Sequence, residues 1–285
     1  MTLFVANVKK LMKMHKSYEK TLKIKSFFYI MKIAILIPST TNNRDWKCIT
    51  DTYLYNSIIS FVTRYNPKYQ YKFFVGIDKD DAIYNDKKQR QKIYELCRTW
   101  SNVCFQFYPF DENIPKGHVS IMWNILYKKA IEEMYDYFYI TGDDIVYLSD
   151  GWLDRCIDAL KTTNNLGAAG CFNGNNEILT QFLVSQTHYA IFNYAYNPKI
   201  KNWWVDNHLH ELYSPSFLHI VEGSCINAGG EPRYKIDFSA KDYYKDLVKE
   251  DKEKLLCFIK SNGGFSHYKR TQGTRSKSQK SIKTN

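Results

Sequence analysis

The sequence predicts an α/β protein, a single large domain built on a central, mostly parallel sheet that is flanked by helices. Short apolar runs do not alternate with polar residues, helical stretches separate them, and several runs end directly on an acid or a polar loop. Strands that are buried on both faces of a parallel sheet show this lack of alternation. Ligands of such sheets bind outside the carboxyl ends of the strands, so we expect the functional site at that edge.

The individual elements follow from apolar periodicity and from the residues that interrupt it. Pro38 stops the first apolar run, "KIAILIP", and the polar loop "STTNNRDW" comes next. Residues 118–134 space their apolar positions as an amphipathic helix does. The full expectation is a strand at 32–38, a helix at 51–64, a strand at 71–78, a helix at 86–98, a strand at 102–110, a helix at 118–134, a strand at 136–141 and a helix at 151–163.

Two neighbouring carboxylates, Asp143 and Asp144, follow the strand expected at 136–141. A buried ionised carboxylate is costly unless it is paired or bound to a metal, so the pair either lies at the surface or has a function. Gly142 lets the backbone turn, so that one carboxylate can bind a divalent ion while the other holds a ribose hydroxyl or a metal-bound water. Such hard oxygen ligands suit Mg²⁺ or Mn²⁺ bridging a diphosphate. The alternative is a pair that only makes the turn polar.

The net charge of +11 belongs to the ends of the chain. Residues 1–32 hold eight Lys and one Glu, and residues 265–285 hold six Lys or Arg and no acid, so these segments carry +7 and +6. Subtracting these 13 charges from +11 leaves about −2 for the middle. We therefore expect a basic N-terminal extension at 1–31 and a disordered basic tail at 265–285. The extension either precedes a natural start at Met31 or forms a basic helix that contacts a membrane surface or a partner.

Other features restrict the compartment and the function class. Seven scattered cysteines without a C-x-x-C pair argue against a disulfide framework and favour a reducing, cytoplasmic location. No apolar run approaches the ~20 residues of a membrane helix. The motifs of nucleoside triphosphatases, dinucleotide oxidoreductases and serine hydrolases are missing. An EF-hand interpretation of "DKDDAIYNDKKQ" fails because Ile83 stands where the tight turn requires glycine.

Five segments in a fixed order resemble the nucleotide-sugar glycosyltransferases of the GT-A fold, nearest to family 2. They are "AILIPSTTNNR", "VGID", "PKG" ahead of a helix with "WN", "TGDDI", and "FLVSQTHYAIFNYAYNPKIKNWWVDNHLHELYSP". The similarity covers about residues 32 to 240, and implies a nucleotide-sugar-binding half at 32–165 and an acceptor-binding half at 166–264. The family usually carries D-x-D, whose acids bind a metal that clamps the donor diphosphate. Here Gly142 stands in the first position.

The resemblance also implies roles for single residues on the donor side. The stretch from Pro38 to Arg44 resembles the loop that holds the base and the diphosphate, and Asp78 resembles the acid that reads uracil or ribose. Lys116 resembles a further donor contact. Asp143 is assigned to the donor and Asp144 to the metal, Mn²⁺ or Mg²⁺. His219 is expected to complete the metal shell, with His267 as the alternative.

The acceptor side needs a general base within reach of the attacking hydroxyl. The segment "NWWVDNH" supplies Asp206 behind Trp203 and Trp204, which form either a platform for a sugar ring or part of the core. Glu211 is the rival base. The turn "GGEPRY" is expected to bring Arg233 toward phosphate or acceptor.

Together these features predict transfer of a sugar from a nucleotide-diphosphate donor, UDP-linked, to an acceptor hydroxyl of a glycan, a protein or a small molecule. If Asp206 is the base, the anomeric configuration inverts. A sugar-nucleotide pyrophosphorylase is an alternative, although "PSTTNNRDW" lacks the glycine-rich loop that such enzymes normally have. A protein of another class, a non-catalytic binder of glycan or of nucleic acid through the basic ends, is the second alternative.

Overall fold

The computed structural model describes residues 29–174 and 177–268. Most of the basic extension expected at 1–31 and most of the basic tail expected at 265–285 lie outside these residues. The strands are β1 (Lys32–Ser39), β2 (Gln70–Asp78), β3 (Val103–Phe110), β4 (Tyr137–Ile140), β5 (Ile145–Tyr147), β6 (Ala168–Gly170), β7 (Phe182–Ser185), β8 (Leu218–Ile220) and β9 (Cys225–Asn227). The helices are η1 (Ile49–Asp51), α2 (Tyr53–Val62), α3 (Lys87–Arg98), α4 (Val119–Glu132), α5 (Trp152–Lys161), α6 (Gln186–Phe192), α7 (Val205–Tyr213), η2 (Ser239–Asp242), α8 (Tyr244–Ser261) and α9 (Gly264–His267).

Seven strands form the central sheet, in the order β3-β2-β1-β4-β7-β6-β8. Strands β1 to β4 are mutually parallel, and β7 runs antiparallel to both of its neighbours. The predicted α/β architecture with a mostly parallel sheet is confirmed. The short strand β5 leaves this sheet and pairs with β9 in a separate two-stranded sheet, which the sequence did not predict.

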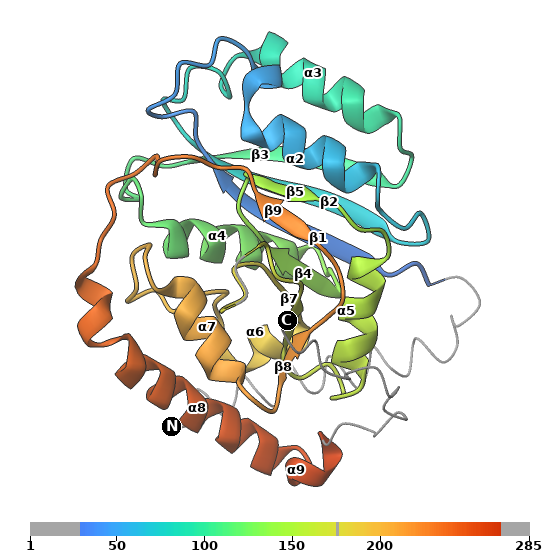
Figure 1. The fold of residues 1–285 in the computed structure, drawn as a ribbon, viewed down its shortest axis with the longest axis vertical. Coiled ribbons are helices and arrows are strands. Elements are labelled where there is room, and N and C mark those ends of the chain that lie inside the picture. Colours follow the sequence, from blue (N-terminus) through green and yellow to red (C-terminus); the bar gives the residue numbers. More distant parts are fainter. Residues whose placement is uncertain (1–28, 175–176, 269–285) are drawn as a thin grey trace, which may run out of the picture.

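Two hydrophobic cores, one on each face, explain why the strands read as unbroken apolar runs. In β1, Ile33, Ile35 and Ile37 belong to one core, whereas Ala34 and Leu36 belong to the other. Successive side chains of a strand point to opposite faces, so a sheet covered on both sides makes every position apolar. Figure 1 shows α2 and α3 over one face of the sheet and α4 over the other.

The carboxyl ends of β1, β2 and β4 meet at one edge of the sheet because these three strands are parallel. The chain returns to this edge after β9, where the amide of Ala228 donates to the carbonyl of Asp144 at 2.8 Å. In Figure 1 this return is the orange trace that leaves β9 and leads to α8.

At the C-terminal side the described fold continues through α9 to the buried Tyr268, past the tail boundary expected at 265. In the described part of the chain, no helix combines the length and the apolarity that a membrane crossing requires.

Candidate active site

Asp143 lies at the carboxyl edge of the sheet and is fully buried. Ser39, the last residue of β1, donates its hydroxyl to Asp143 Oδ2 at 2.5 Å. The guanidinium of Arg233 donates one hydrogen bond to each carboxylate oxygen of Asp143. The charge of this aspartate is therefore compensated by a bidentate ion pair, the form in which a buried carboxylate is tolerated.

Asp144 has a different environment from that of its neighbour. Its Oδ2 lies 3.8 Å from Arg233 Nη2, and its side chain is 17% exposed. Burial raises the pKa of Asp144 to about 6, and the charge of Asp143 adds to this effect. Its surroundings therefore disfavour the charged form of this carboxyl group.

Two glycines make room for the carboxylate of Asp144. A Cβ atom on Gly142 would lie 2.8 Å from its Oδ1, and one on Gly229 would lie 2.0 Å from its Oδ2. Gly142 is not among the residues with positive φ, so its role is to provide space and not the special turn that the sequence suggested.

The segment of residues 228–238, which we call the crossing segment, is fixed over this edge by several hydrogen bonds. Asn42 and Asn43 donate to the carbonyl of Arg233 at 2.9 and 3.2 Å. Arg44 donates to the carbonyl of Glu231. The hydroxyl of Tyr234 donates to Asp78 Oδ2 at 2.7 Å. The crossing segment therefore joins the loop after β1 to the acid at the end of β2.

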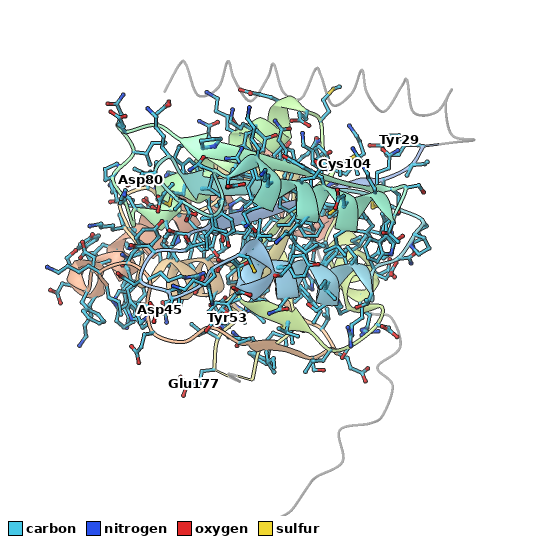
Figure 2. All side chains as sticks on the ribbon, turned by 90° about the horizontal axis from the view of Figure 1, so that it is seen from above. Tyr29, Asp45, Tyr53, Asp80, Cys104 and Glu177 are labelled. Carbon is cyan, nitrogen blue, oxygen red and sulfur yellow. The ribbon has the colours of Figure 1, made fainter. Side chains whose placement is uncertain are left out.

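Tyr53 at the start of α2 lies beside the loop after β1, near the labelled Asp45 in Figure 2. The guanidinium carbons of Arg44 and Arg233 each lie 5.9 Å from the centre of its ring. A ring face attracts cations at this separation. Tyr53 thus lies close to both guanidinium groups.

Asp206 stands in the first turn of α7 and accepts a hydrogen bond from the hydroxyl of Tyr196 at 3.1 Å. Burial raises the pKa of Asp206 to about 7, and the charge of Asp144 raises it further. This interaction indicates that Asp206 lies near the acidic pair. A carboxylate with a pKa near neutrality is suited to general base catalysis.

The two tryptophans before Asp206 have different surroundings. Trp204 stacks on Tyr244, with ring centres 5.1 Å apart, and belongs to the packing between α7 and α8. Trp203 is 47% exposed and touches only the edge of Phe238 among the described aromatic rings, with centres 5.8 Å apart. Trp203 is therefore the one of the two that exposes a ring surface.

The structure does not bring His219 to Asp144, and the expected shared metal shell is not formed by these two residues. His219 is buried in β8, three strand positions from β4, which corresponds to about 14 Å. Its Nε2 lies 3.1 Å from the hydroxyl of Thr163. The alternative, His267, lies in α9, which packs against α8 and not at the carboxyl edge.

The remaining predicted residues have these positions. Lys116 is exposed and forms an ion pair with Asp80 at 2.5 Å. Glu211 accepts from Tyr244 at 3.0 Å and lies about 140° around α7 from Asp206. Pro38 lies within β1 opposite Gly76, one residue before the site.

Asp81 and Tyr234 were not expected at this edge from the sequence, whereas Ser39 and Thr40 belong to the stretch from Pro38 to Arg44 that was. Thr40 donates to Asp78 Oδ2 at 2.9 Å, and Asp81 accepts from the amide of Thr41 at 2.6 Å. Ser39 and Tyr234 contact the acids directly, as described above. The available signal for Asp81 was its place in the chain, since it follows the apolar strand that ends at Asp78.

No family model matches the sequence, and no curated protein is detectably similar to it. Among solved structures, S. aureus TarS superposes with a TM-score of 0.50 at 12% identity, over 80% of this chain and 43% of that chain. TarS has a GT-A-like fold. The present chain has a GT-A-like fold. At this identity the likeness concerns the fold, and this chain spans less than half the length of that TarS chain.

A second structure, titled S. aureus TarS 1-349 in complex with UDP-GlcNAc, has a TM-score of 0.49 at 14% identity, over 85% of this chain and 75% of that chain. The resemblance in fold expected from the sequence motifs is thus confirmed by the first comparison, while the chemistry of this chain has to be argued from its own residues.

Proposed function

We propose that this protein is a glycosyltransferase that moves a sugar from a UDP-linked donor to an acceptor hydroxyl with inversion. One observation carries the proposal. In a GT-A-like fold, Asp206 stands in the first turn of α7 and accepts a hydrogen bond from Tyr196, and burial, with a contribution from the charge of Asp144, raises its pKa to about 7. A base and a cation-bearing edge are the two halves that sugar transfer needs.

In the proposed reaction the acceptor oxygen attacks the anomeric carbon and forms the new glycosidic bond. The bond between that carbon and the β-phosphate oxygen breaks, and its electron pair goes to the departing UDP. Asp206 takes the proton of the acceptor hydroxyl. Asp78, at the end of β2, receives the nucleoside, and the guanidinium groups of Arg44 and Arg233 face the diphosphate. Trp203 supports the acceptor ring.

The divalent ion expected from the sequence stays a prediction, and the residues present do not fit it in this arrangement. Both oxygens of Asp143 already accept from Arg233, so a metal ligated there would have to displace the guanidinium. Within residues 29–174 and 177–268, no three His, Cys, Asp or Glu side chains are grouped so that they could hold a metal ion. We therefore assign no step of the reaction to a metal.

Asp206 also favours transfer over the pyrophosphorylase alternative. A pyrophosphorylase uses a phosphate oxygen as nucleophile, which is already ionised at neutral pH and needs no base. An acceptor hydroxyl does need one, and Asp206 supplies a base with a suitable pKa.

A donor screen with the full-length chain tests the function. We expect release of free UDP from one or more UDP-sugars, and no comparable release from GDP- or TDP-sugars. With a suitable acceptor, NMR of the product should give the anomeric configuration opposite to that of the donor. Failure to bind UDP and to release it from every UDP-sugar would contradict the proposal, as would binding of nucleic acid that weakens steeply with salt as the sole activity.

A further inference from the structure

We propose that the guanidinium of Arg233 replaces the divalent cation of this site, so that the enzyme transfers sugar without a metal. The inference rests on the proposed function and adds to it the group that stabilises the departing diphosphate. It starts from a contact between two residues 90 positions apart, Arg233 and Asp143.

Arg233 occupies the position between the carboxylates of Asp143 and Asp144. Arg233 faces both oxygens of Asp143 and approaches Asp144 Oδ2 to 3.8 Å, so it lies where a cation shared by the two acids would lie. The side chains of Arg233 and Asp143 are only 16% and 1% exposed. A guanidinium and a carboxylate pair bidentately in a fixed plane, which makes this a defined arrangement and not a passing surface contact.

The backbone around Arg233 is held in place by hydrogen bonds. Its own carbonyl accepts from Asn42 and Asn43, and its neighbour Tyr234 is bound to Asp78. Arg233 and its neighbour Tyr234 are thus attached to the loop after β1 and to the end of β2, respectively. Its charge reaches the site from a backbone that is fixed in place, as preorganised electrostatic stabilisation requires.

Arg233 retains N–H donors that Asp143 does not use. Arginine has five N–H donors, and the two hydrogen bonds to Asp143 use two of them. The other three make no hydrogen bond to the described residues. They are free to donate to the oxygens of a diphosphate, whose geometry suits a guanidinium.

A second guanidinium, that of Arg44, lies near Arg233. Arg44 shares the ring of Tyr53 with Arg233, and its Nε is buried without a hydrogen-bond partner among the described residues. A buried unsatisfied donor is costly, and a phosphate oxygen would satisfy it. Together the two side chains carry two positive charges, the same total as one Mn²⁺ or Mg²⁺ ion.

The test compares the full-length wild type with Arg233→Ala and Arg233→Lys, and with Arg98→Ala as a control on the exposed surface of α3. Turnover of the UDP-sugar found in the donor screen is measured in EDTA and in Mn²⁺, and UDP affinity is measured by calorimetry in EDTA. We expect wild-type turnover to agree within about two-fold between the two buffers. Arg233→Ala should lose about 100-fold in turnover, and added guanidinium chloride at millimolar concentration should restore part of it.

The lysine variant separates geometry from charge, since lysine keeps the positive charge but not the two-pronged contact. We expect Arg233→Lys to bind UDP in EDTA more tightly than Arg233→Ala does and to stay below wild type in turnover. The control Arg98→Ala should match wild type in both measurements.

Three results would overturn the inference. If EDTA abolishes wild-type turnover and Mn²⁺ restores it, the function stands and a metal supplies the charge. If Arg233→Ala turns over at the wild-type rate, Arg233 has no part in the reaction. If the wild type neither binds UDP nor turns over any UDP-sugar in either buffer, the proposed function fails as well. The wild-type comparison requires no variant to fold.

Discussion

Replacing Asp206 by Asn should lower the kcat of sugar transfer by about 10³-fold, because general base catalysis contributes 10²- to 10⁴-fold and an amide cannot accept the proton. Asparagine preserves the size of the side chain and can still accept the hydrogen bond from Tyr196. The fold and the affinity for UDP should therefore remain, and the loss should appear in kcat. Measurement of transfer rates and UDP affinity on the same sample separates these effects.

The matched control is Glu211→Gln on the same helix, which should retain wild-type kcat because Glu211 contacts Tyr244 and not the site. The pH profile gives a second check. Because burial raises the pKa of Asp206 to about 7 in the unliganded protein, wild-type kcat/KM should rise about ten-fold per pH unit below that value and level off above it. An Asp206→Asn variant with normal kcat, or a larger loss in Glu211→Gln, would disprove the assignment of the base.

Replacing Asp143 by Asn should destabilise the fold by about 2–4 kcal/mol and abolish transfer. The amide leaves the mostly buried charge of Arg233 without its counter-ion, and breaking one partner of a buried pair is strongly destabilising. Urea unfolding at pH 8 measures the loss in free energy, and transfer assays measure the loss in activity.

The neighbouring substitution Asp144→Asn provides the contrast. Burial raises the pKa of Asp144 to about 6, so its ionised form opposes folding above that pH and this cost disappears as the group is protonated below it. At pH 8, Asp144→Asn should therefore be at least as stable as wild type, whereas Asp143→Asn should be less stable. Equal stability losses in the two variants would contradict the different roles given to the two acids.

The order of the main-sheet strands and of the helices through α5 could be predicted because each apolar run indicates a strand that is buried on both faces of the sheet. In β1, alternate residues enter opposite cores, and this makes the run continuously apolar. The two-stranded sheet of β5 and β9 was not predictable in this way. Each strand has three residues, too few for a period, and their pairing joins segments 80 residues apart. The antiparallel direction of β7 likewise depends on pairing and not on its composition.

The acids of the site follow a similar division. Asp78 and the pair Asp143–Asp144 could be located from the sequence because they end buried strands at one edge. The partner of Asp143 could not, since Arg233 arrives from a loop whose path is fixed by contacts with Asn42 and Asn43. His219 was chosen because the resemblance implies a histidine in this later segment, and its position in β8 is set by packing between strands, which the sequence motif does not report.

The account as a whole depends on a diphosphate lying between the guanidinium groups and the end of β4. A crystal structure of the protein with UDP bound is the most direct measurement. We predict that the diphosphate contacts Arg233 while Arg233 remains paired with Asp143, and that the uridine lies at Asp78. Asp206 should lie on the side of the terminal β-phosphate, where the sugar of the donor would be attached. UDP bound at another surface, or lying with its diphosphate away from Arg233 and Asp143, would contradict the account.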